Sequence, residues 1–295
     1  MKIAIFGWVI QEHFYVYLKQ LLQELARREV SVSCYSPLYL YIIKEREEFS
    51  SHFHALFDEE APLETDTDLL ISIGGDGTFL DAVCHVKDSG IPVLGINCGR
   101  MGFLANVARE EIMQVVALLC DRRFDVEQRA LLQLEMENNP FSFGYALNDA
   151  CALKTETASM LKIHAYIEEE YLTTYWADGL IVATPTGSTA YSLSGGGPIL
   201  FPTCEDLILT PVSPHNLNQR SLVIPRTERI RLRVESRSSD FMLRLDSRVQ
   251  RVTSSQELYV SSAGFKLNMV KIPTPGYYEA LRNKLGWGED KRNRE

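Results

Sequence analysis

Short apolar runs alternate with amphipathic helical patterns over the first 120 residues of the chain. The apolar runs lie at residues 3–7, 30–35, 69–73 and 92–96, and the helical patterns at residues 14–28, 38–49, 78–87 and 109–120. Strands that alternate with helices predict a parallel sheet whose ligands bind beyond the carboxyl ends of the strands. We therefore expect an N-terminal α/β domain with a parallel sheet over residues 1–123.

The pattern changes after residue 124. Helical periods nearly vanish, and short alternating runs separated by polar turns continue to residue 270. Such runs are typical of hairpins, so we expect a mainly β domain over residues 124–272. Residues 273–295 should then form a terminal helix that returns to the N-terminal domain, followed by a charged, mobile tail from residue 288.

Composition excludes several classes of protein. The formal net charge of −9 argues against a broad nucleic-acid or anionic-membrane surface. No apolar segment is long enough to span a bilayer, and the first apolar run lacks a small-residue cleavage site, so we expect a strand there. The six cysteines show neither C-x-x-C nor zinc-like spacing, which predicts buried free thiols in a reducing cytoplasm.

The motif Gly74-Gly75-Asp76-Gly77-Thr78 directly follows the predicted strand at residues 69–73. Glycines at a strand end let the main chain approach a phosphate, and the following helix adds free amides and a favourable dipole. An aspartate held there can accept a proton from a hydroxyl nucleophile or help to organise Mg²⁺. The motif therefore indicates phosphoryl transfer to an alcohol. The alternative is a tight strand-to-helix turn in which Asp76 caps the helix.

A second block of small and hydroxylated residues spans positions 178–198. Its hydroxyls surround Pro185, Gly187 and a triple glycine, and Asp178 could accept hydrogen bonds from ribose hydroxyls. The hydroxyl-bearing residues are Thr184, Thr186, Ser188, Thr189, Tyr191, Ser192 and Ser194. Such a loop offers many donors at little steric cost. The alternative is a glycine-rich turn in which a serine or threonine caps a helix, with no ligand involved.

The two blocks, in this order, resemble the NAD kinase family. Three shorter motifs add to the resemblance, which covers most of the chain. They are Asn97-Cys98-Gly99-Arg100-Met101-Gly102-Phe103-Leu104, Ala146-Leu147-Asn148-Asp149 and Thr210-Pro211-Val212-Ser213-Pro214-His215. The chain departs from the family pattern at Asp149, where glutamate is usual, at Trp176, where relatives often have a polar or basic residue, and at Arg248, where glutamine is common.

The resemblance implies a reaction in which ATP phosphorylates the 2′-hydroxyl of the adenosine ribose of NAD, giving NADP. Asp76, a buried acid in this interpretation, would accept the proton, with Gly77 beside it in the dinucleotide site. Asn148 and Asp149 would meet the adenosine portion, and Asp178 would face the nicotinamide riboside. The remaining residues implied for NAD are Ser159, Thr186, Thr189, Ala190, Tyr191, Ser192, Leu193 and Ser194, and those implied for the ATP phosphates are Gly74, Gly75 and Thr78.

The resemblance also implies the accompanying molecules. A divalent cation, expected to be Mg²⁺, would be carried by the nucleotide, with no metal site of the protein's own. NAD and ATP would be the only partners besides further copies of the chain, as a dimer or a tetramer in the cytoplasm.

Two rival functions share parts of the pattern. A lipid or sphingoid-base kinase would share the Gly-Gly-Asp-Gly turn, but the segment from Thr184 to Tyr191 argues against it. A catalytically silent dinucleotide sensor would keep the pocket, but the presence of Asp76 argues against that. Neither a G-x-G-x-x-G motif after a strand nor a G-x-x-x-x-G-K-[ST] loop occurs, which excludes a dehydrogenase of that type and a P-loop enzyme.

Overall fold

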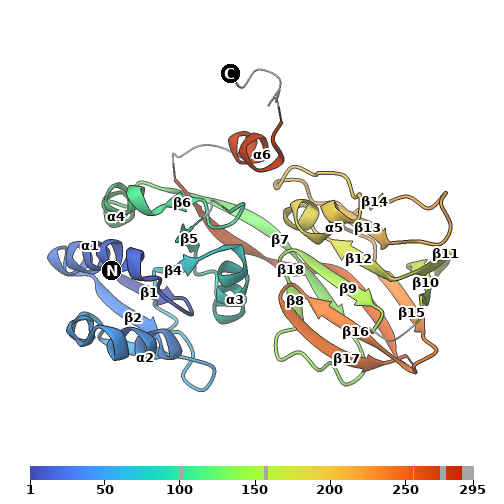
Figure 1. The fold of residues 1–295 in the computed structure, drawn as a ribbon, viewed down its shortest axis with the longest axis horizontal. Helices are drawn as coiled ribbons and strands as arrows, with labels where there is room; N and C mark the ends of the chain where they lie inside the picture. Colours follow the sequence, from blue (N-terminus) through green and yellow to red (C-terminus); the bar gives the residue numbers. More distant parts are fainter. Residues whose placement is uncertain (100–101, 156–158, 255, 273–276, 288–295) are drawn as a thin grey trace. The chain divides into compact units, whose positions relative to one another are not determined.

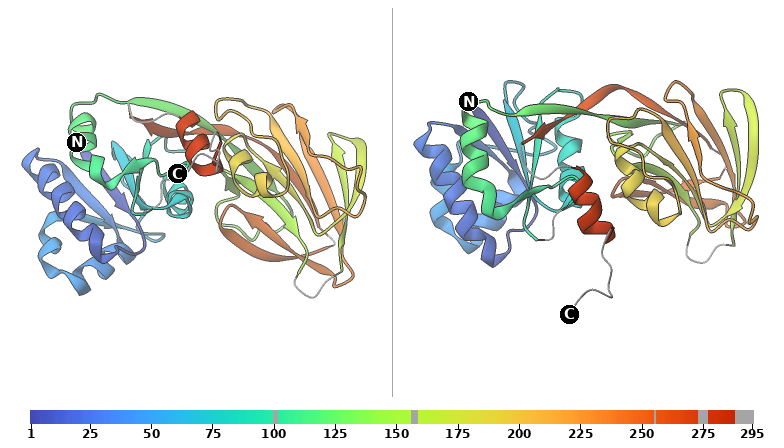
Figure 2. Two further views of the ribbon diagram at one scale, coloured as in Figure 1. Left: turned by 45° about the horizontal axis from the view of Figure 1, so that its top comes forward. Right: turned by 90° about the horizontal axis from the view of Figure 1, so that it is seen from above.

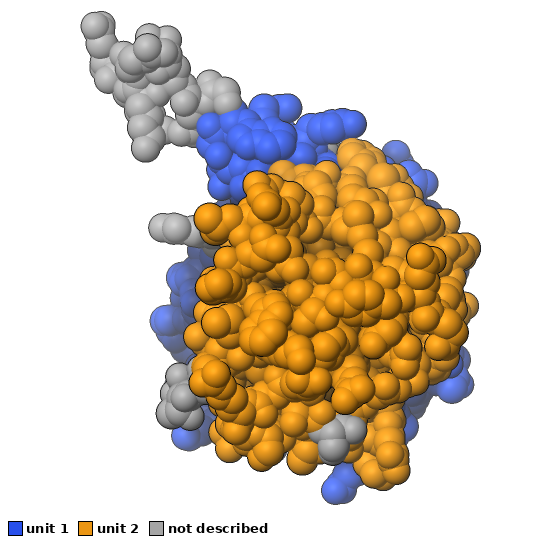
Figure 3. All heavy atoms as spheres, turned by 90° about the vertical axis from the view of Figure 1, so that its right-hand side faces the viewer, with its two compact units in different colours: residues 1–127, 268–295 blue, residues 128–267 orange. Residues whose placement is uncertain are grey.

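The computed structural model describes residues 1–99, 102–155, 159–254, 256–272 and 277–287. The chain divides into two compact units, which Figure 3 shows in different colours. Unit 1 comprises residues 1–127 and 268–295, and unit 2 comprises residues 128–267. The parallel strands between residues 2 and 97 belong to unit 1, and most of the antiparallel strands belong to unit 2.

Unit 1 is built on a parallel sheet (Figure 1). The strands run in the order β3-β2-β1-β4-β5, and all four neighbouring pairs are parallel. Their bounds are β1 Lys2–Phe6, β2 Ser31–Tyr35, β3 Ala55–Phe57, β4 Leu69–Gly74 and β5 Val93–Asn97. A short strand, β6 (Val107–Ala108), adds to β5. The central strands are buried along nearly their whole length, which explains why they appear in the sequence as continuous apolar runs.

Helices follow these strands as the alternation predicted. They are α1 (Tyr15–Arg27), α2 (Ser36–Glu45), α3 (Asp76–Val86), α4 (Ile112–Cys120) and the C-terminal α6 (Tyr277–Leu285), with 3-10 turns η1 (Glu12–Phe14), η2 (Glu47–His52) and η3 (Arg109–Glu111). Helix α1 buries Leu18, Leu21, Leu22 and Leu25, a stripe at helical spacing. Helices α1 and α4 lie side by side (Figure 2).

Two predicted helices differ in detail from those observed. The pattern at residues 38–49 belongs to α2 and the separate turn η2, because the backbone of Arg46 leaves the helical region. The pattern at residues 109–120 begins as the 3-10 turn η3, where the Glu111 carboxylate accepts the N–H of Ala108. The predicted C-terminal helix corresponds to α6. Residues 273–276 and the tail from residue 288 lie outside the described residues.

Unit 2 contains mainly antiparallel β-structure, so the predicted fold class is confirmed. One sheet has the strand order β11-β10-β15-β18, and the other has the order β14-β13-β12-β9-β16-β17. A further strand pair joins β7 to β8. The bounds are β7 Asp125–Glu135, β8 Tyr145–Ala146, β9 Asp149–Leu153, β10 Leu161–Ile167, β11 Glu170–Ala177, β12 Gly179–Ala183, β13 Leu207–Val212, β14 Leu222–Ile224, β15 Ile230–Glu235, β16 Asp240–Leu245, β17 Arg248–Thr253 and β18 Glu257–Lys271. Alternate side chains of these strands form one core.

Some strands were not predicted from the sequence. Two separate strand-like runs, at residues 257–260 and 265–270, were expected from the sequence, but both belong to one 15-residue strand, β18. This strand pairs with β15 near its start and with β5 through Met269. Strand β13 includes Thr210-Pro211-Val212, where the proline obscures the strand pattern, and β17 is mostly polar and exposed. Between β12 and β13 lie the 3-10 turn η4 (Thr186–Thr189) and the single helical turn α5 (Tyr191–Ser194).

The cysteines are free, but not all are buried. Cys34, Cys98 and Cys151 are buried, whereas Cys84 and Cys120 are partly buried. The prediction of a buried thiol is wrong for Cys204, which is exposed because it ends a surface turn closed by a hydrogen bond from its N–H to Phe201 O. Of the helices that the structure describes, none combines the length and apolar character required to cross a bilayer.

Candidate active site

The Gly-Gly-Asp-Gly turn lies at the carboxyl end of β4. In the sheet order β3-β2-β1-β4-β5, the direction of winding reverses between β1 and β4, and such a reversal is where open α/β sheets bind ligands. Gly75 precedes α3 and Asp76 is its first residue. A Cβ atom added to Gly75 or Gly77 would meet no atom within 4 Å, so the main chain is open on that side. A phosphate could therefore approach the amides closely.

The Asp76 carboxylate is held by the segment that follows β5. Its Oδ2 accepts the N–H of Phe103 at 2.9 Å, and its Oδ1 accepts the N–H groups of Leu104 and Ala105, each at 3.0 Å. A Cβ atom on Gly102 would lie 1.8 Å from Oδ1, so only glycine fits there. The side chain thus orients this loop through three main-chain donors, and the N-cap position of α3 belongs to Gly75, one residue before Asp76.

Asp76 is less buried than the sequence suggested. Its side chain is 32% exposed, so the expectation of a buried acid is wrong. The reason is its position at the start of a helix, between two glycines that add no side chain of their own. Three main-chain donors, and not burial, hold the carboxylate in place.

Gly74 and Thr78 form the base of the same turn. The Thr78 Oγ1 atom lies 2.3 Å from the place that a Cβ atom on Gly74 would occupy. The threonine side chain therefore packs against the main chain of Gly74, and any larger residue at position 74 would displace it. Of the three residues predicted for phosphate binding, only Gly75 has an open face; Gly74 and Thr78 shape the turn.

In unit 2, the Ala146-Leu147-Asn148-Asp149 motif is held by a carboxylate in the same manner. The Asp246 side chain accepts the N–H groups of Leu147 at 2.8 Å, Asn148 at 2.7 Å and Asp149 at 3.2 Å. Asp246 lies in the turn between β16 and β17 and is only 8% exposed. It was not among the predicted site residues. Its neighbour Arg248 donates to main-chain oxygens just before the motif, which gives Arg248 a structural role.

Asp246 should make stability depend on pH. Burial raises its pKa to about 6 from an ordinary value of 3.8, and the N–H groups of Leu147 and Asn148 oppose the rise. The folded state therefore binds this proton more tightly than the unfolded chain does. The resulting stabilisation is complete below the unfolded pKa and disappears as the pH rises through the folded one.

We therefore expect the free energy of unfolding of the wild type, relative to Asp246→Asn, to fall by about 3 kcal/mol between roughly pH 4 and pH 7, at about 1.4 kcal/mol per pKa unit. Urea unfolding of both proteins across this range would measure the difference. A constant difference would contradict the raised pKa.

A second residue missed by sequence reasoning, Arg244, connects two predicted dinucleotide residues. Its Nη2 lies 3.0 Å from Oδ1 of the buried Asp149, and its guanidinium carbon lies 4.5 Å from the centroid of the Tyr191 ring. The Cys151 thiol donates to the same Asp149 oxygen at 3.1 Å. Asp149 is thus paired within the protein. The sequence signal for Arg244 was a charged residue directly after the apolar residues Phe241, Met242 and Leu243 of β16.

The segment after β12 is hydrogen-bonded to the Ala146–Asp149 motif. Thr184 Oγ1 donates to Leu147 O at 2.6 Å and accepts the N–H of Gly187 at 3.0 Å, while the N–H of Thr184 donates to Asn148 O at 2.9 Å. A Cβ atom on Gly187 would lie 2.0 Å from Asn148 O. The structure therefore brings together two motifs that the sequence separates by more than thirty residues.

The residues between positions 186 and 194 that were predicted to bind NAD fall into two groups. Ser192 is fully buried and its Oγ pairs with Thr210 Oγ1 at 2.9 Å, and Thr186 is also buried, so these hydroxyls serve internal packing. The partly or fully exposed members are Thr189, Ala190, Tyr191, Leu193 and Ser194. Only this second group presents side chains to solvent.

Asp178 and Ser159 lie apart from this cluster. Asp178 precedes β12 and Thr184 follows it, so the two are separated by the length of the strand, roughly 20 Å at about 3.4 Å per residue. Asp178 forms an ion pair with Lys154 at 2.8 Å. Ser159 is exposed and lies two residues before Leu161, which pairs with Ala177, the neighbour of Asp178 in the chain. The structure therefore does not group these two residues with Asn148.

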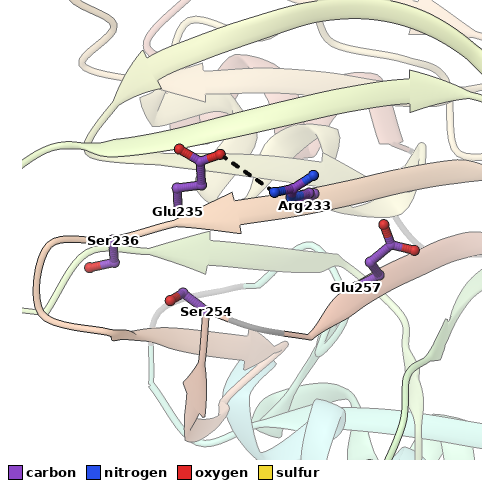
Figure 4. A pocket seen from close by; sticks show the side chains of 5 residues that line it. All are labelled: Arg233, Glu235, Ser236, Ser254 and Glu257. Atoms are coloured by element: carbon purple, nitrogen blue, oxygen red, sulfur yellow. Dashed lines mark ion pairs between the residues drawn. The ribbon is translucent and has the colours of Figure 1, made fainter.

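A separate cavity of about 540 Å³ lies elsewhere on unit 2, at the ends of β15, β17 and β18 (Figure 4). Arg233 and Glu235 come from β15 and face one another at 3.9 Å, and the other lining residues are Ser236, Ser254 and Glu257. None of the predicted site residues lines it. Within the described part of the chain, no group of three or more histidine, cysteine, aspartate or glutamate side chains could hold a metal ion.

Comparison with known proteins gives consistent results along the chain. Residues 8–124 match the model of the ATP-NAD kinase N-terminal domain, and residues 147–272 match that of the ATP-NAD kinase C-terminal domain. The NAD kinase of Flavobacterium psychrophilum is 40% identical over 296 residues, covering 99% of this chain and all of that protein. The NAD kinase of Porphyromonas gingivalis is 41% identical over 288 residues, covering 97% of this chain and 98% of that protein.

Two solved structures share the fold. Yeast NADH kinase complexed with NADH superposes with a TM-score of 0.84 at 26% identity, covering all of this chain and 90% of that one. An NAD kinase from Archaeoglobus fulgidus in complex with ATP superposes with a TM-score of 0.72 at 23% identity, covering 97% of this chain and 99% of that one.

Proposed function

The chain belongs to the NAD kinase family, and we propose that Asp76 accepts the proton of the 2′-hydroxyl on the adenosine ribose of NAD. The reaction transfers the γ-phosphate of ATP to that hydroxyl and gives NADP. The observation that carries the proposal for Asp76 is a carboxylate fixed by three main-chain donors beside an open glycine turn.

A fixed carboxylate suits this role. A secondary ribose hydroxyl is a poor nucleophile at neutral pH, so the protein must position it and remove its proton. A carboxylate has about four lone-pair positions, and the three N–H groups use two on Oδ1 and one on Oδ2. Proton transfer would therefore use the remaining position on Oδ2 of Asp76.

The open turn supports binding of the ATP phosphates. Main-chain amides at Gly75 and Gly77 have no side chain in front of them, and they begin α3, an 11-residue helix whose dipole favours an anion. ATP would enter as its complex with a divalent cation, Mg²⁺, because phosphate oxygens are ligands that this ion prefers and its charge offsets theirs.

The two hydrogen-bonded motifs of unit 2, Ala146–Asp149 and the segment after β12, support dinucleotide binding. We infer that Asn148 and Asp149 meet the adenosine, with Gly187 fixing the Asn148 main chain and Arg244 fixing the Asp149 carboxylate. The exposed residues from Thr189 to Ser194 would line the same site. Asp178 and Ser159 would serve the nicotinamide riboside end, which suits their separation from Asn148.

We also infer a cytoplasmic homo-oligomer, a dimer or a tetramer. Strand β11 is at one edge of its sheet in unit 2 and carries the half-exposed side chains of Tyr171 and Trp176. An edge strand with exposed aromatic residues is a suitable surface for pairing with a second copy. Sedimentation of the purified chain would give the number of copies.

An assay with several acceptors tests the function directly. With ATP and Mg²⁺, we expect NAD to yield NADP and ADP in equal amounts, and we expect removal of the cation with EDTA to stop product formation until Mg²⁺ is restored. Diacylglycerol offered under the same conditions is the control acceptor and should remain unphosphorylated. Phosphorylation of diacylglycerol in place of NAD would indicate a lipid kinase, and NAD binding without product would indicate a sensor.

A further inference from the structure

Lys284, near the end of α6, places its ammonium beside the proposed proton acceptor. Its Nζ lies 3.5 Å from Oδ2 of Asp76 and 4.3 Å from the centroid of the Phe103 ring. Tyr277, at the start of α6, contacts the same ring, with 6.2 Å between the ring centroids. All of these residues belong to unit 1. The C-terminal helix therefore reaches the loop that holds Asp76 at two points, and Lys284 is the charged one.

The ammonium lies next to the carboxylate oxygen that retains an unused lone-pair position. Oδ1 of Asp76 accepts two main-chain N–H groups, whereas Oδ2 accepts one. At 3.5 Å, the distance between Lys284 Nζ and Oδ2 allows Coulomb attraction but is longer than a good hydrogen bond, so that position stays open to a hydroxyl donor. The cation–π contact with Phe103 keeps the flexible lysine side chain in this place.

A purely structural role would be small. The side chains of Lys284 and Asp76 are 29% and 32% exposed, and ion pairs of this kind contribute about 0–1 kcal/mol to stability. A fixed cation beside Oδ2 of Asp76 holds that oxygen in one orientation, and base assistance depends on such positioning. The contact is thus better suited to the reaction than to folding.

We propose that Lys284 is a positioning residue for the reaction, which orients Oδ2 of Asp76 and supplies positive charge beside it. The inference rests on the proposed function of Asp76 as proton acceptor. It assigns the C-terminal helix a part in turnover, although the motifs of the sequence contain none of its residues.

The test compares Lys284→Met, Lys284→Arg and the control Arg282→Met, which removes an exposed positive charge from the same helix. We expect Lys284→Met to lower kcat about 10- to 100-fold, as removal of one preorganised charge does, with the KM for NAD changed less than about twofold. Lys284→Arg should recover part of kcat because it keeps the charge. Arg282→Met should behave as the wild type, and the thermal midpoints of all four proteins should agree closely.

Two results would overturn the proposal: an unchanged kcat in Lys284→Met, or a raised KM for NAD with kcat intact. The double variant with Asp76→Asn separates this inference from the proposed function. If Lys284 acts through Asp76, its removal should have no further effect in that background. If Asp76→Asn alone keeps its turnover, the proposed function of Asp76 fails; if it loses turnover while Lys284→Met does not, only the role of Lys284 fails.

Discussion

Asp76→Asn should lose about 10²–10⁴-fold in turnover while the protein still folds and binds NAD. This range is what base assistance by a positioned side chain typically contributes. The amide has nearly the shape of the carboxylate but cannot accept the ribose proton at the position that Oδ2 occupies. Turnover by a coupled assay and NAD binding by calorimetry would measure the two quantities separately.

The hydrogen bonds of Asp76 predict a second, smaller effect of the same change. Asparagine has one acceptor oxygen, which can keep the N–H groups of Leu104 and Ala105, but its Nδ2 would then face the N–H of Phe103. Leaving that donor unpaired costs about 1–3 kcal/mol at most, since the site is partly exposed. Urea unfolding should therefore show a modest loss of stability.

Asp81→Asn is the matched control. Asp81 lies on the same helix, α3, and its carboxylate accepts the indole N–H of Trp8 at 2.8 Å, a bond that an amide oxygen can keep. The charge change is the same as in Asp76→Asn, yet turnover should stay near that of the wild type. Near-normal turnover in Asp76→Asn would remove Asp76 from the role of base.

The elements of unit 1 could be predicted because their signals are local. Strands β1, β4 and β5 are buried on both faces, so each appears as a continuous apolar run that composition alone reveals. The turn after β4 was predictable for the same reason, since glycines follow directly on such a run. The break between α2 and η2 was not, because it depends on the backbone of one residue, Arg46, and leaves the apolar pattern intact.

The residues that support the site could not be predicted, because their contacts join distant parts of the chain. Asp246 binds the main chain of Leu147, 99 positions away, and Arg244 pairs with Asp149, 95 positions away. Neither belongs to a motif with a local spacing. The family resemblance also implied that Ser192 binds NAD, whereas in the structure its buried hydroxyl forms a hydrogen bond with Thr210 Oγ1 of β13. Whether such a polar residue binds a ligand or supports the protein's own main chain therefore depends on its position in the sheet and not on its residue type.

Gly187→Ala should damage dinucleotide binding more than its single added methyl suggests. The new Cβ atom would lie 2.0 Å from the carbonyl oxygen of Asn148, 2.5 Å from its carbonyl carbon and 2.7 Å from its Cα. All three are main-chain atoms, so no side-chain rotation relieves the overlap, and the Asn148 main chain must move. A shift of about 1 Å in a positioning residue can cost about 100-fold. We expect kcat/KM for NAD to fall by about that factor.

The same overlap should destabilise unit 2. Overpacking in a closely packed site costs about 1–3 kcal/mol, and here the displaced carbonyl also accepts the N–H of Thr184. Gly264→Ala is the control, because a Cβ atom there would meet nothing within 4 Å and the residue lies on an exposed position of β18. That variant should keep both the kinetics and the unfolding midpoint of the wild type. A normal KM for NAD in Gly187→Ala, with the expected loss of stability, would place the adenosine away from Asn148.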